Sequence, residues 1–404
     1  MNTSTIADII KQGLPAYQQQ YGALNADACK AVAAIVKCRT PLMGGHRYEC
    51  ERCGHELRLF NSCRNRHCPT CQTTARLQWV SDRIDDLLPV GYFHAVFTIP
   101  QELNPFALRN RAALYSILFR AVKETLLKLA SDPKRLGAQI GIIMVLHTWG
   151  QNVLEHPHIH CIIPGGGLDS DTDRWKAGPC GFLFPIAVMQ KLYRGIFMDY
   201  FVKAVSTGGI VLHGQLQEYK DAGRLQKLKN ILYNKRWVVY IKPPFASPQA
   251  VIKYLGQYTH RVAISNKRII SVESGMVTLS YKDYADGNKQ KAMRVTAVEF
   301  VRRFLLHIVP TGFVRIRHYG ILANCNRKTK LAKCRKIFHK KPPTNRKKKR
   351  AGRLWSDIVK ELTGRDLNRC PSCGGRLSLV AVLPRVQVVN VQHMPHVIAR
   401  APVS

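Results

Sequence analysis

The spacing of apolar residues predicts a small helical region at the amino-terminal end. Ile6, Ile9 and Ile10 recur at helical spacing, which places them on one face of a short helix. A second apolar stripe covers residues 29–36. Residues 1–45 are therefore expected to form two short helices that lead into the rest of the chain.

Strands and helices alternate after residue 90. Residues 92–99 have the composition of a strand, and a long amphipathic helix is expected at 109–130. Residues 141–150 and the histidine-containing run that follows them are two further strands. This order predicts an antiparallel sheet with helices on one face, an α+β plan. The same patterns predict helices at 187–205 and 298–306, strands at 237–241 and 314–318, and a hairpin of 267–272 with 276–282.

Composition divides the chain into three expected domains. Residues 1–90 combine the helical lead-in with a cysteine-rich segment, 91–320 hold the α+β pattern, and 321–404 form a basic extension. Within the extension, residues 327–353 are a tract of Lys and Arg interrupted by two prolines. Such a tract is either an arm laid on nucleic acid or a solvated linker, and the sequence leaves both open.

The net charge indicates the kind of partner. Lys and Arg number 62 against 25 Asp and Glu, a formal charge of +37, so a polyanion is favoured and nucleic acid first among polyanions. No run reaches the roughly 18 apolar residues of a membrane helix, and the amino terminus lacks a signal-peptide pattern. We therefore expect no membrane partner and a cytoplasmic, nucleoid-associated protein.

Cysteine spacing predicts structural zinc. The chain has 13 Cys, and two Cys-x-x-Cys pairs, Cys50 with Cys53 and Cys68 with Cys71, stand close to the spacing of a four-thiolate zinc site. These four residues are the first candidates for its ligands. Cys63 and His67 are alternates, or ligands of a second ion together with His46 or His55.

A further Cys-x-x-Cys pair stands near the carboxy-terminal end. Cys370 and Cys373, followed by two glycines, make half of a possible second zinc site. The sequence leaves its other ligands open, with Cys325, Cys334, His393 and His396 as candidates.

Arginines around the first cysteine pairs suggest contact with DNA phosphates. Arg64 and Arg66 lie between the two pairs, where a zinc module commonly presents cations to the backbone. The alternative is a zinc module that only braces the fold.

Two histidines on one strand face predict a second kind of metal site. His158 and His160 are two residues apart, so a strand points both imidazoles to the same side. A pair of neutral imidazoles can hold a divalent cation with coordination positions left open, although two partly exposed histidines are the simpler explanation. Gln151 is the first candidate for a third ligand, and Glu155 and Gln257 are the others.

A later segment carries two tyrosines on one predicted helix face. Tyr254 and Tyr258 are four residues apart and therefore one turn from each other. Lys253 and Arg261 would place cations near the phenols and near bound DNA. Half-buried packing is the alternative role for such a pair.

Together these features suggest strand cleavage with a covalent intermediate. Mg²⁺ or Mn²⁺ held by the histidines would polarise a phosphate, and a tyrosine oxygen would attack phosphorus and remain on the 5′ side. The break could then be resealed onto a new strand. No Gly-x-x-x-x-Gly-Lys-Ser/Thr phosphate loop occurs in the chain, so host helicase and replication machinery are expected partners.

The motifs also carry a family resemblance. The His158-Ile159-His160 strand, the 254–261 segment and the 62–69 segment resemble, in type and order, the rolling-circle HUH transposases of the insertion-sequence-ninety-one family. The resemblance runs from about residue 10 to residue 335. It implies an HUH nuclease core of antiparallel sheet flanked by helices. It also implies a two-tyrosine enzyme that nicks single-stranded DNA at an element end and uses both tyrosines in successive transfers into a target.

Three alternatives remain at this level. A plasmid-type rolling-circle replication initiator or relaxase would use the same chemistry without transfer to new targets. A zinc-dependent regulator would bind DNA without cleaving it, and a metal-dependent nuclease would use water and leave no protein–DNA adduct.

Overall fold

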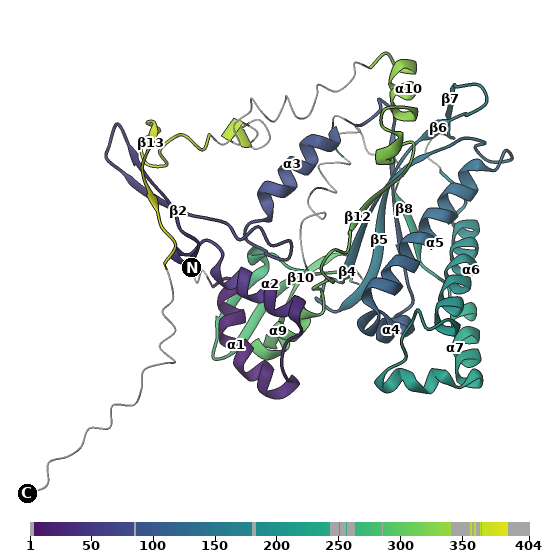
Figure 1. The fold of residues 1–404 in the computed structure, drawn as a ribbon, viewed down its shortest axis with the longest axis horizontal. Coiled ribbons are helices and arrows are strands. Elements are labelled where there is room, and N and C mark those ends of the chain that lie inside the picture. Colours follow the sequence, from purple (N-terminus) through teal and green to yellow (C-terminus); the bar gives the residue numbers. More distant parts are fainter. Residues whose placement is uncertain are drawn as a thin grey trace, which may run out of the picture.

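The computed structural model (Figure 1) confirms a mixed fold of helices and antiparallel sheets. It describes residues 4–84, 86–179, 183–242, 263–284, 286–340 and 366–386, with 250, 256, 356–357, 359–360 and 364. The helices are α1 (Ile6–Tyr21), α2 (Ala26–Lys37), α3 (Gln72–Ile84), α4 (Asn104–Arg109), α5 (Arg111–Ser131), α6 (Ile186–Ser206), α7 (Ala222–Asn234), α9 (Ala297–Leu305) and α10 (Lys330–Ile337), with short 3-10 turns at Pro41–Met43, Gln101–Leu103, Gly214–Lys220, Asn266–Arg268 and Asn324–Asn326. The strands are β1 (Gly45–Cys50), β2 (Glu56–Phe60), β3 (Tyr92–Thr98), β4 (Gly141–Trp149), β5 (Glu155–Pro164), β6 (Gly166–Leu168), β7 (Trp175–Ala177), β8 (Val239–Lys242), β9 (Ile269–Glu273), β10 (Met276–Asp283), β11 (Lys289–Thr296), β12 (Ile316–Gly320) and β13 (Leu377–Leu383).

A five-stranded antiparallel sheet organises the molecule, in the order β12-β4-β5-β3-β8. Helices α5 and α6 lie side by side against one of its faces (Figure 1). Alternate residues of β5 point to that face, and Ile159, Cys161 and Ile163 are buried there among the apolar side chains of both helices. This large core fixes the position of β5, the strand that carries His158 and His160.

The amino-terminal helices pack on residues far along the chain. Thr5 and Asp8 form a capping box that begins α1. Ile6 and Ile9 are fully buried and share one hydrophobic core with Phe300 of α9. The helical lead-in is therefore anchored to the region that follows the sheet β11-β10-β9.

The predicted hairpin is confirmed as β9 and β10, and β11 adds a third strand that the sequence did not suggest. β11 pairs with β10 along its whole length. Its burial alternates from Lys291 to Thr296, but only Met293 and Val295 of the inward positions are apolar, so the apolar pattern in the sequence is too short to predict a strand.

The first part of the basic tract differs from the expectation of a solvated arm. Residues 330–337 form α10, and Leu331 and Cys334 are buried. The buried carboxylate of Asp86 forms ion pairs with Arg327 and with Arg335. Charge neutralisation by Asp86 and apolar burial together hold this segment on the domain; residues 341–355 lie outside the described part of the chain.

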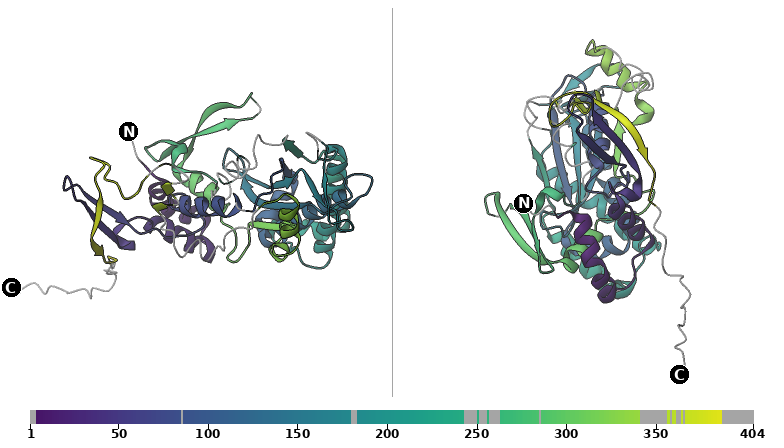
Figure 2. Two further views of the ribbon diagram at one scale, coloured as in Figure 1. Left: turned by 90° about the horizontal axis from the view of Figure 1, so that it is seen from above. Right: turned by 90° about the vertical axis from the view of Figure 1, so that its left-hand side faces the viewer.

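A separate three-stranded sheet, β13-β1-β2, lies at the end of the molecule remote from α6 and α7 (Figure 2). It joins a strand from near the carboxy-terminal end to the amino-terminal cysteine-rich region. In the described part of the chain, no helix has the length and apolar character needed to cross a membrane.

Candidate metal centre and DNA-processing site

The candidate metal centre lies on the face of the central sheet opposite α5 and α6. Because successive strand residues alternate, burying Ile159 and Cys161 on the helix side directs His158 and His160 to the other side. The antiparallel register pairs His147 of β4 directly with His158. Three imidazoles therefore meet on one face of two neighbouring strands.

The distances between these imidazoles suit a metal ion. One ligand nitrogen from each of His147, His158 and His160 lies within 4.8 Å of the others. The Nε2 atoms of His158 and His160 are 3.1 Å apart. Two ligands at right angles with bonds of about 2.1 Å would stand about 3 Å apart, so this spacing fits a shared cation.

The second nitrogen of two of these rings is already engaged. His158 Nδ1 lies 2.7 Å from the carbonyl oxygen of His156, to which it donates. His160 Nδ1 lies 2.8 Å from Nε2 of His94, a buried histidine of β3. Such outer partners fix ring orientation and leave Nε2 for an ion. Burial lowers the pKa of His158 to about 3 and the pKa of His160 well below its ordinary value, so both rings are neutral at pH 7.

Two of the three predicted third ligands occupy other positions. Glu155 is four residues before Ile159 on β5 and therefore points to the same face, the one covered by helices. There its Oε1 accepts a hydrogen bond of 2.9 Å from the Tyr115 hydroxyl. Burial raises the pKa of Glu155 to about 7. Gln151 lies in the turn after β4, and its Nε2 donates to the Tyr284 hydroxyl at 3.1 Å. Gln257 lies outside the described residues.

The candidate nucleophiles Tyr254 and Tyr258, with Lys253 and Arg261, also lie outside the described residues. Between the tyrosines, however, Gly256 is described, and it is helical and buried. A Cβ built on Gly256 would lie 2.2 Å from Cγ2 of Val80 in α3.

Among the described residues the cysteines form two clusters of four, and their grouping differs from the predicted one. Cys68 and Cys71 join Cys63 and Cys38, with the Sγ atoms of Cys63 and Cys71 3.7 Å apart. Cys38 ends α2 and was not among the predicted ligands. Four thiolates in one cluster are the donor set of structural zinc.

The second cluster combines the two ends of the chain. Cys50 and Cys53, here called the β1 knuckle, lie beside Cys370 and Cys373, here called the tail knuckle. The expectation that the β1 knuckle shares an ion with Cys68 and Cys71 is therefore corrected. Among the other suggested partners, Cys325 is exposed and Cys334 is buried, each apart from both clusters; His46 and His55 join neither, and His393 and His396 lie outside the described residues.

The alternate ligand His67 has a different contact. Its Nε2 accepts a hydrogen bond of 3.2 Å from the backbone N–H of Val309. Burial, with Arg315 nearby, lowers the pKa of His67 to about 3. The residue therefore joins the cysteine-rich region to the segment after α9 as a neutral acceptor.

The two arginines of this region differ in exposure. Arg64 is exposed, whereas Arg66 is half-buried and donates from Nη1 to the carbonyl oxygen of Phe313 at 2.7 Å. Nε and Nη2 of Arg66 are buried with no hydrogen-bond partner among the described residues. Arg64 is thus accessible at the surface, whereas Arg66 joins the cysteine-rich region to the segment after α9.

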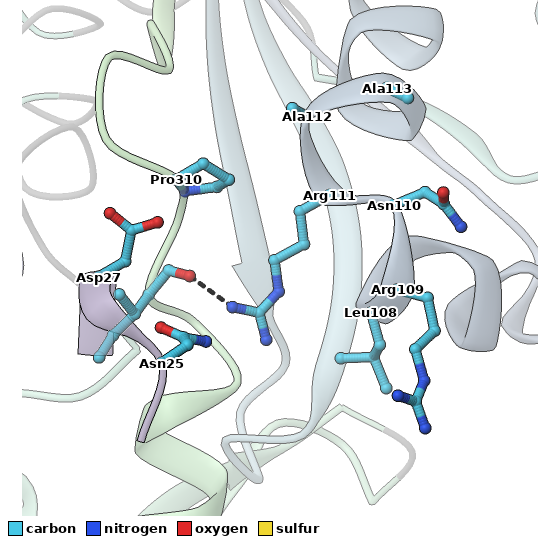
Figure 3. A pocket seen from close by; sticks show the side chains of 10 residues that line it. Asn25, Asp27, Leu108, Arg109, Asn110, Arg111, Ala112, Ala113 and Pro310 are labelled. Atoms are coloured by element: carbon cyan, nitrogen blue, oxygen red, sulfur yellow. Dashed lines mark hydrogen bonds between the residues drawn. The ribbon is translucent and has the colours of Figure 1, made fainter. Parts of the chain in front are cut away.

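A polar pocket of about 450 Å³ opens between α2 and the junction of α4 with α5 (Figure 3). The Arg111 side chain extends into it, and its Nη1 donates to the carbonyl oxygen of Ile308 at 2.6 Å. Arg109 lies at the opposite wall from Asp27 (Figure 3). The pocket walls are formed by Asn25, Asp27, Leu108, Arg109, Asn110, Arg111, Ala112, Ala113, Ile308 and Pro310.

His147 and Cys38 are the ligand candidates that sequence reasoning missed. The signal for His147 was the short turn between the two predicted strands, because an antiparallel hairpin fixes which residue lies opposite His158. For Cys38 the sequence held no signal beyond the presence of a cysteine at the end of a predicted helix.

Comparison with known proteins identifies the family. Residues 9–99 match the family described as "Transposase zinc-binding domain", that of IS91, and residues 141–330 match the family described as "Putative transposase". The "Putative transposase y4qJ" of Sinorhizobium fredii is 45% identical over 368 residues, covering 91% of this chain and 92% of that protein. The "Transposase for insertion sequence element IS801" of Pseudomonas savastanoi pv. phaseolicola is 26% identical over 377 residues, covering 92% of this chain and 88% of that protein.

No solved structure matches the chain. Because the matches extend over both the cysteine-rich region and the central domain, and one relative is similar along nearly the whole length, the chain belongs to the IS91 family of insertion-sequence transposases.

Proposed function

We propose that this transposase is a two-tyrosine HUH enzyme that nicks and rejoins single-stranded DNA through a 5′-phosphotyrosine linkage during rolling-circle transposition. Tyr254 and Tyr258 are the proposed nucleophiles. The observation that supports the proposal most strongly is the cluster of His147, His158 and His160 on one face of the central sheet.

The three imidazoles would hold the catalytic ion. Nitrogen donors bind first-row transition ions more readily than Mg²⁺, so Mn²⁺ is the stronger of the two candidates. When bound, the ion would withdraw charge from a scissile phosphate. His94 and the His156 carbonyl would keep the ligand rings oriented for this task.

The proposed step exchanges one phosphoester for another. A tyrosine hydroxyl gives up its proton as its oxygen bonds to phosphorus, the bond from phosphorus to the 3′ oxygen breaks, and the 3′ oxygen takes up a proton to become the free 3′ hydroxyl. The linkage conserves the phosphodiester energy, so a later 3′ hydroxyl can reverse the step on another strand. Two tyrosines allow one to hold the first strand while the other attacks the second.

Basic residues would bring the DNA to this site. Arg64 is exposed beside the first cysteine cluster, and Lys253 and Arg261 flank the tyrosines in sequence. The pocket that holds Arg109 and Arg111 offers further cations for the backbone. The partners are single-stranded element ends and target DNA, with host replication enzymes supplying strand separation.

The test is a covalent-adduct assay. The protein is incubated with labelled single-stranded DNA from the element end and Mn²⁺ or Mg²⁺, and denaturing gels detect a protein–DNA adduct. We expect an adduct in wild type and in the matched control Tyr233→Phe, whose tyrosine lies on α7, and none with chelator or in the Tyr254→Phe/Tyr258→Phe double variant.

Other outcomes identify the alternatives. Cleavage without an adduct would indicate water as nucleophile, and binding without cleavage would indicate a regulator. An adduct that never transfers to a second DNA would indicate a replication initiator or relaxase.

A further inference from the structure

The tail knuckle and the β1 knuckle have the same backbone structure. In each, the N–H of the first cysteine donates to the carbonyl of the residue five positions later, at 3.0 Å in the β1 knuckle and 2.7 Å in the tail knuckle. In each, a glycine four positions later donates back to the first cysteine, from Gly54 at 2.9 Å and from Gly374 at 3.0 Å. Both glycines have positive φ, 68° and 72°, which a side chain would disfavour.

The tail knuckle also directs N–H groups at its sulfurs. Ser372 donates to Cys370 Sγ and Gly375 donates to Cys373 Sγ, both at 3.4 Å. Backbone N–H groups aimed at sulfur stabilise thiolates, the form in which cysteine binds metal. A Cβ on Gly375 would lie 3.0 Å from Cys50 Sγ, so glycine permits the close approach of the two knuckles.

The distances between the sulfurs fit a metal ion better than a disulfide. Cys50 Sγ is 3.4 Å from Cys373 Sγ, and Cys53 Sγ is 3.8 Å from Cys370 Sγ. Tetrahedral zinc with bonds of about 2.3 Å places its sulfur ligands about 3.8 Å apart. A disulfide would require about 2.05 Å.

The sheet beside this cluster has little apolar burial of its own. β13 pairs with β1 over its whole length. Of the described residues, none from β1, β2 or β13 belongs to a hydrophobic core cluster. Leu379 and Val382 of β13 are 53% and 69% exposed. Hydrogen bonds alone give a small sheet marginal stability, so β13 requires another attachment.

We infer that the two knuckles share one zinc ion, a site separate from that of Cys38, Cys63, Cys68 and Cys71, and that this ion fastens the carboxy-terminal strand to the amino-terminal domain. The paired cysteines are 323 and 317 positions apart, so the ion closes a loop that contains the whole central domain. Neither knuckle alone supplies the four ligands of a structural site. The inference does not depend on the proposed cleavage chemistry.

The test is the zinc content of the purified full-length protein, without DNA. We expect about two zinc ions per chain in wild type, one for each four-thiolate cluster. Cys370→Ser/Cys373→Ser should lower the count by about one, and so should Cys50→Ser/Cys53→Ser, because each variant removes half of one site. The matched control Cys29→Ser/Cys325→Ser, which changes two exposed cysteines apart from both clusters, should keep the wild-type count.

Combining the two knuckle variants gives the sharpest result. Because both knuckles hold the same ion, the fourfold variant should lose no more zinc than either double variant. Retention of the wild-type count in Cys370→Ser/Cys373→Ser would overturn the inference. Loss of an additional ion in the fourfold variant would overturn it as well, since the knuckles would then hold separate ions.

A second measurement separates loss of the ion from failure to fold. Cys373→His replaces the sulfur ligand with a nitrogen ligand and should retain the zinc that Cys373→Ser loses. With a specific protease site inserted between residues 344 and 351, the cleaved tail should elute with the rest of the chain in wild type. In the Cys370→Ser/Cys373→Ser background the cleaved tail should separate from the rest of the chain. Co-elution of the tail in that background would contradict attachment through a shared zinc ion.

Discussion

The contact between Gly256 and Val80 of α3 predicts an energetic coupling between positions 256 and 80. A Cβ at position 256 would lie 2.2 Å from Cγ2 of Val80, whereas carbon atoms in contact prefer about 3.5–4.0 Å. Val80 is 6% exposed and β-branched, so its side chain has few other rotamers to adopt. Gly256→Ala should therefore force α3 and the backbone of residue 256 apart.

The magnitude follows from two opposing effects. Overpacking a buried contact costs about 1–3 kcal/mol. Alanine in a helix gains about 1 kcal/mol over glycine. In a Val80→Ala background the nearest remaining atom is Val80 Cβ at 3.7 Å, an ordinary contact, so only the gain remains. Gly256→Ala should therefore destabilise wild type or leave it unchanged, and stabilise Val80→Ala, with a coupling of about 1–3 kcal/mol.

The assay is denaturant unfolding of wild type, both single variants and the double variant, with adduct formation measured in parallel. Gly256 lies between the two proposed nucleophiles in the sequence, so the single variant Gly256→Ala should form less adduct than wild type. Adding Val80→Ala to that variant should restore part of the adduct. A coupling below about 0.5 kcal/mol would refute the reasoning, because the free-energy changes of substitutions at distant, independent sites also deviate from additivity by up to about that amount.

Three further predictions concern the metal centre, a buried carboxyl and the basic surface. His147→Ala should lower metal-dependent adduct formation at least about 10-fold, as removal of metal-site groups commonly does. Gln151→Ala should keep at least half of the wild-type adduct. If a metal titration showed the larger loss in Gln151→Ala, Gln151 would be a metal ligand after all. Because burial raises the pKa of Glu155 to about 7, the folded state holds a proton on this carboxyl that the unfolded state releases from about pH 4.5 upward, so Glu155 by itself should contribute a loss of roughly 3 kcal/mol of stability between pH 4.5 and 7. Glu155→Gln should remove most of that loss, and parallel pH–stability curves for the two proteins would argue against it. Arg64→Ala should weaken DNA binding and reduce the slope of log affinity against log salt by about 1, without changing the free energy of unfolding. Arg66→Ala should instead lower the midpoint temperature of thermal unfolding. Salt titrations and thermal scans that assigned the binding effect to Arg66 and the stability effect to Arg64 would contradict the exposures described.

The central sheet was predictable because burial on one face leaves a clear pattern. Alternation of apolar residues with His158 and His160 identified both the strand and the side on which the imidazoles lie. The third imidazole required the strand register in addition. Glu155 does not lie beside the histidines, because strand parity turns it to the opposite face.

The cysteine grouping could not be derived from spacing. Two pairs close in sequence suggested one local site, but pairing of β13 with β1 brings a third pair from the far end of the chain. Likewise, the charges of 327–353 suggested an arm on nucleic acid or a solvated linker. Nothing in the tract itself reveals that Arg327 and Arg335 form ion pairs with Asp86. Long-range pairing decides both cases, and a single sequence carries little information about it.

The most direct test of the central claim is to identify the residue that carries the DNA. Trypsin cleavage after Lys253 and Arg261 would release a peptide that contains both Tyr254 and Tyr258. Mass spectrometry of the adduct, after nuclease trimming, should find a nucleotide joined to a tyrosine oxygen of this peptide. DNA attached to any other residue, or cleavage with no covalent link, would contradict the tyrosine mechanism.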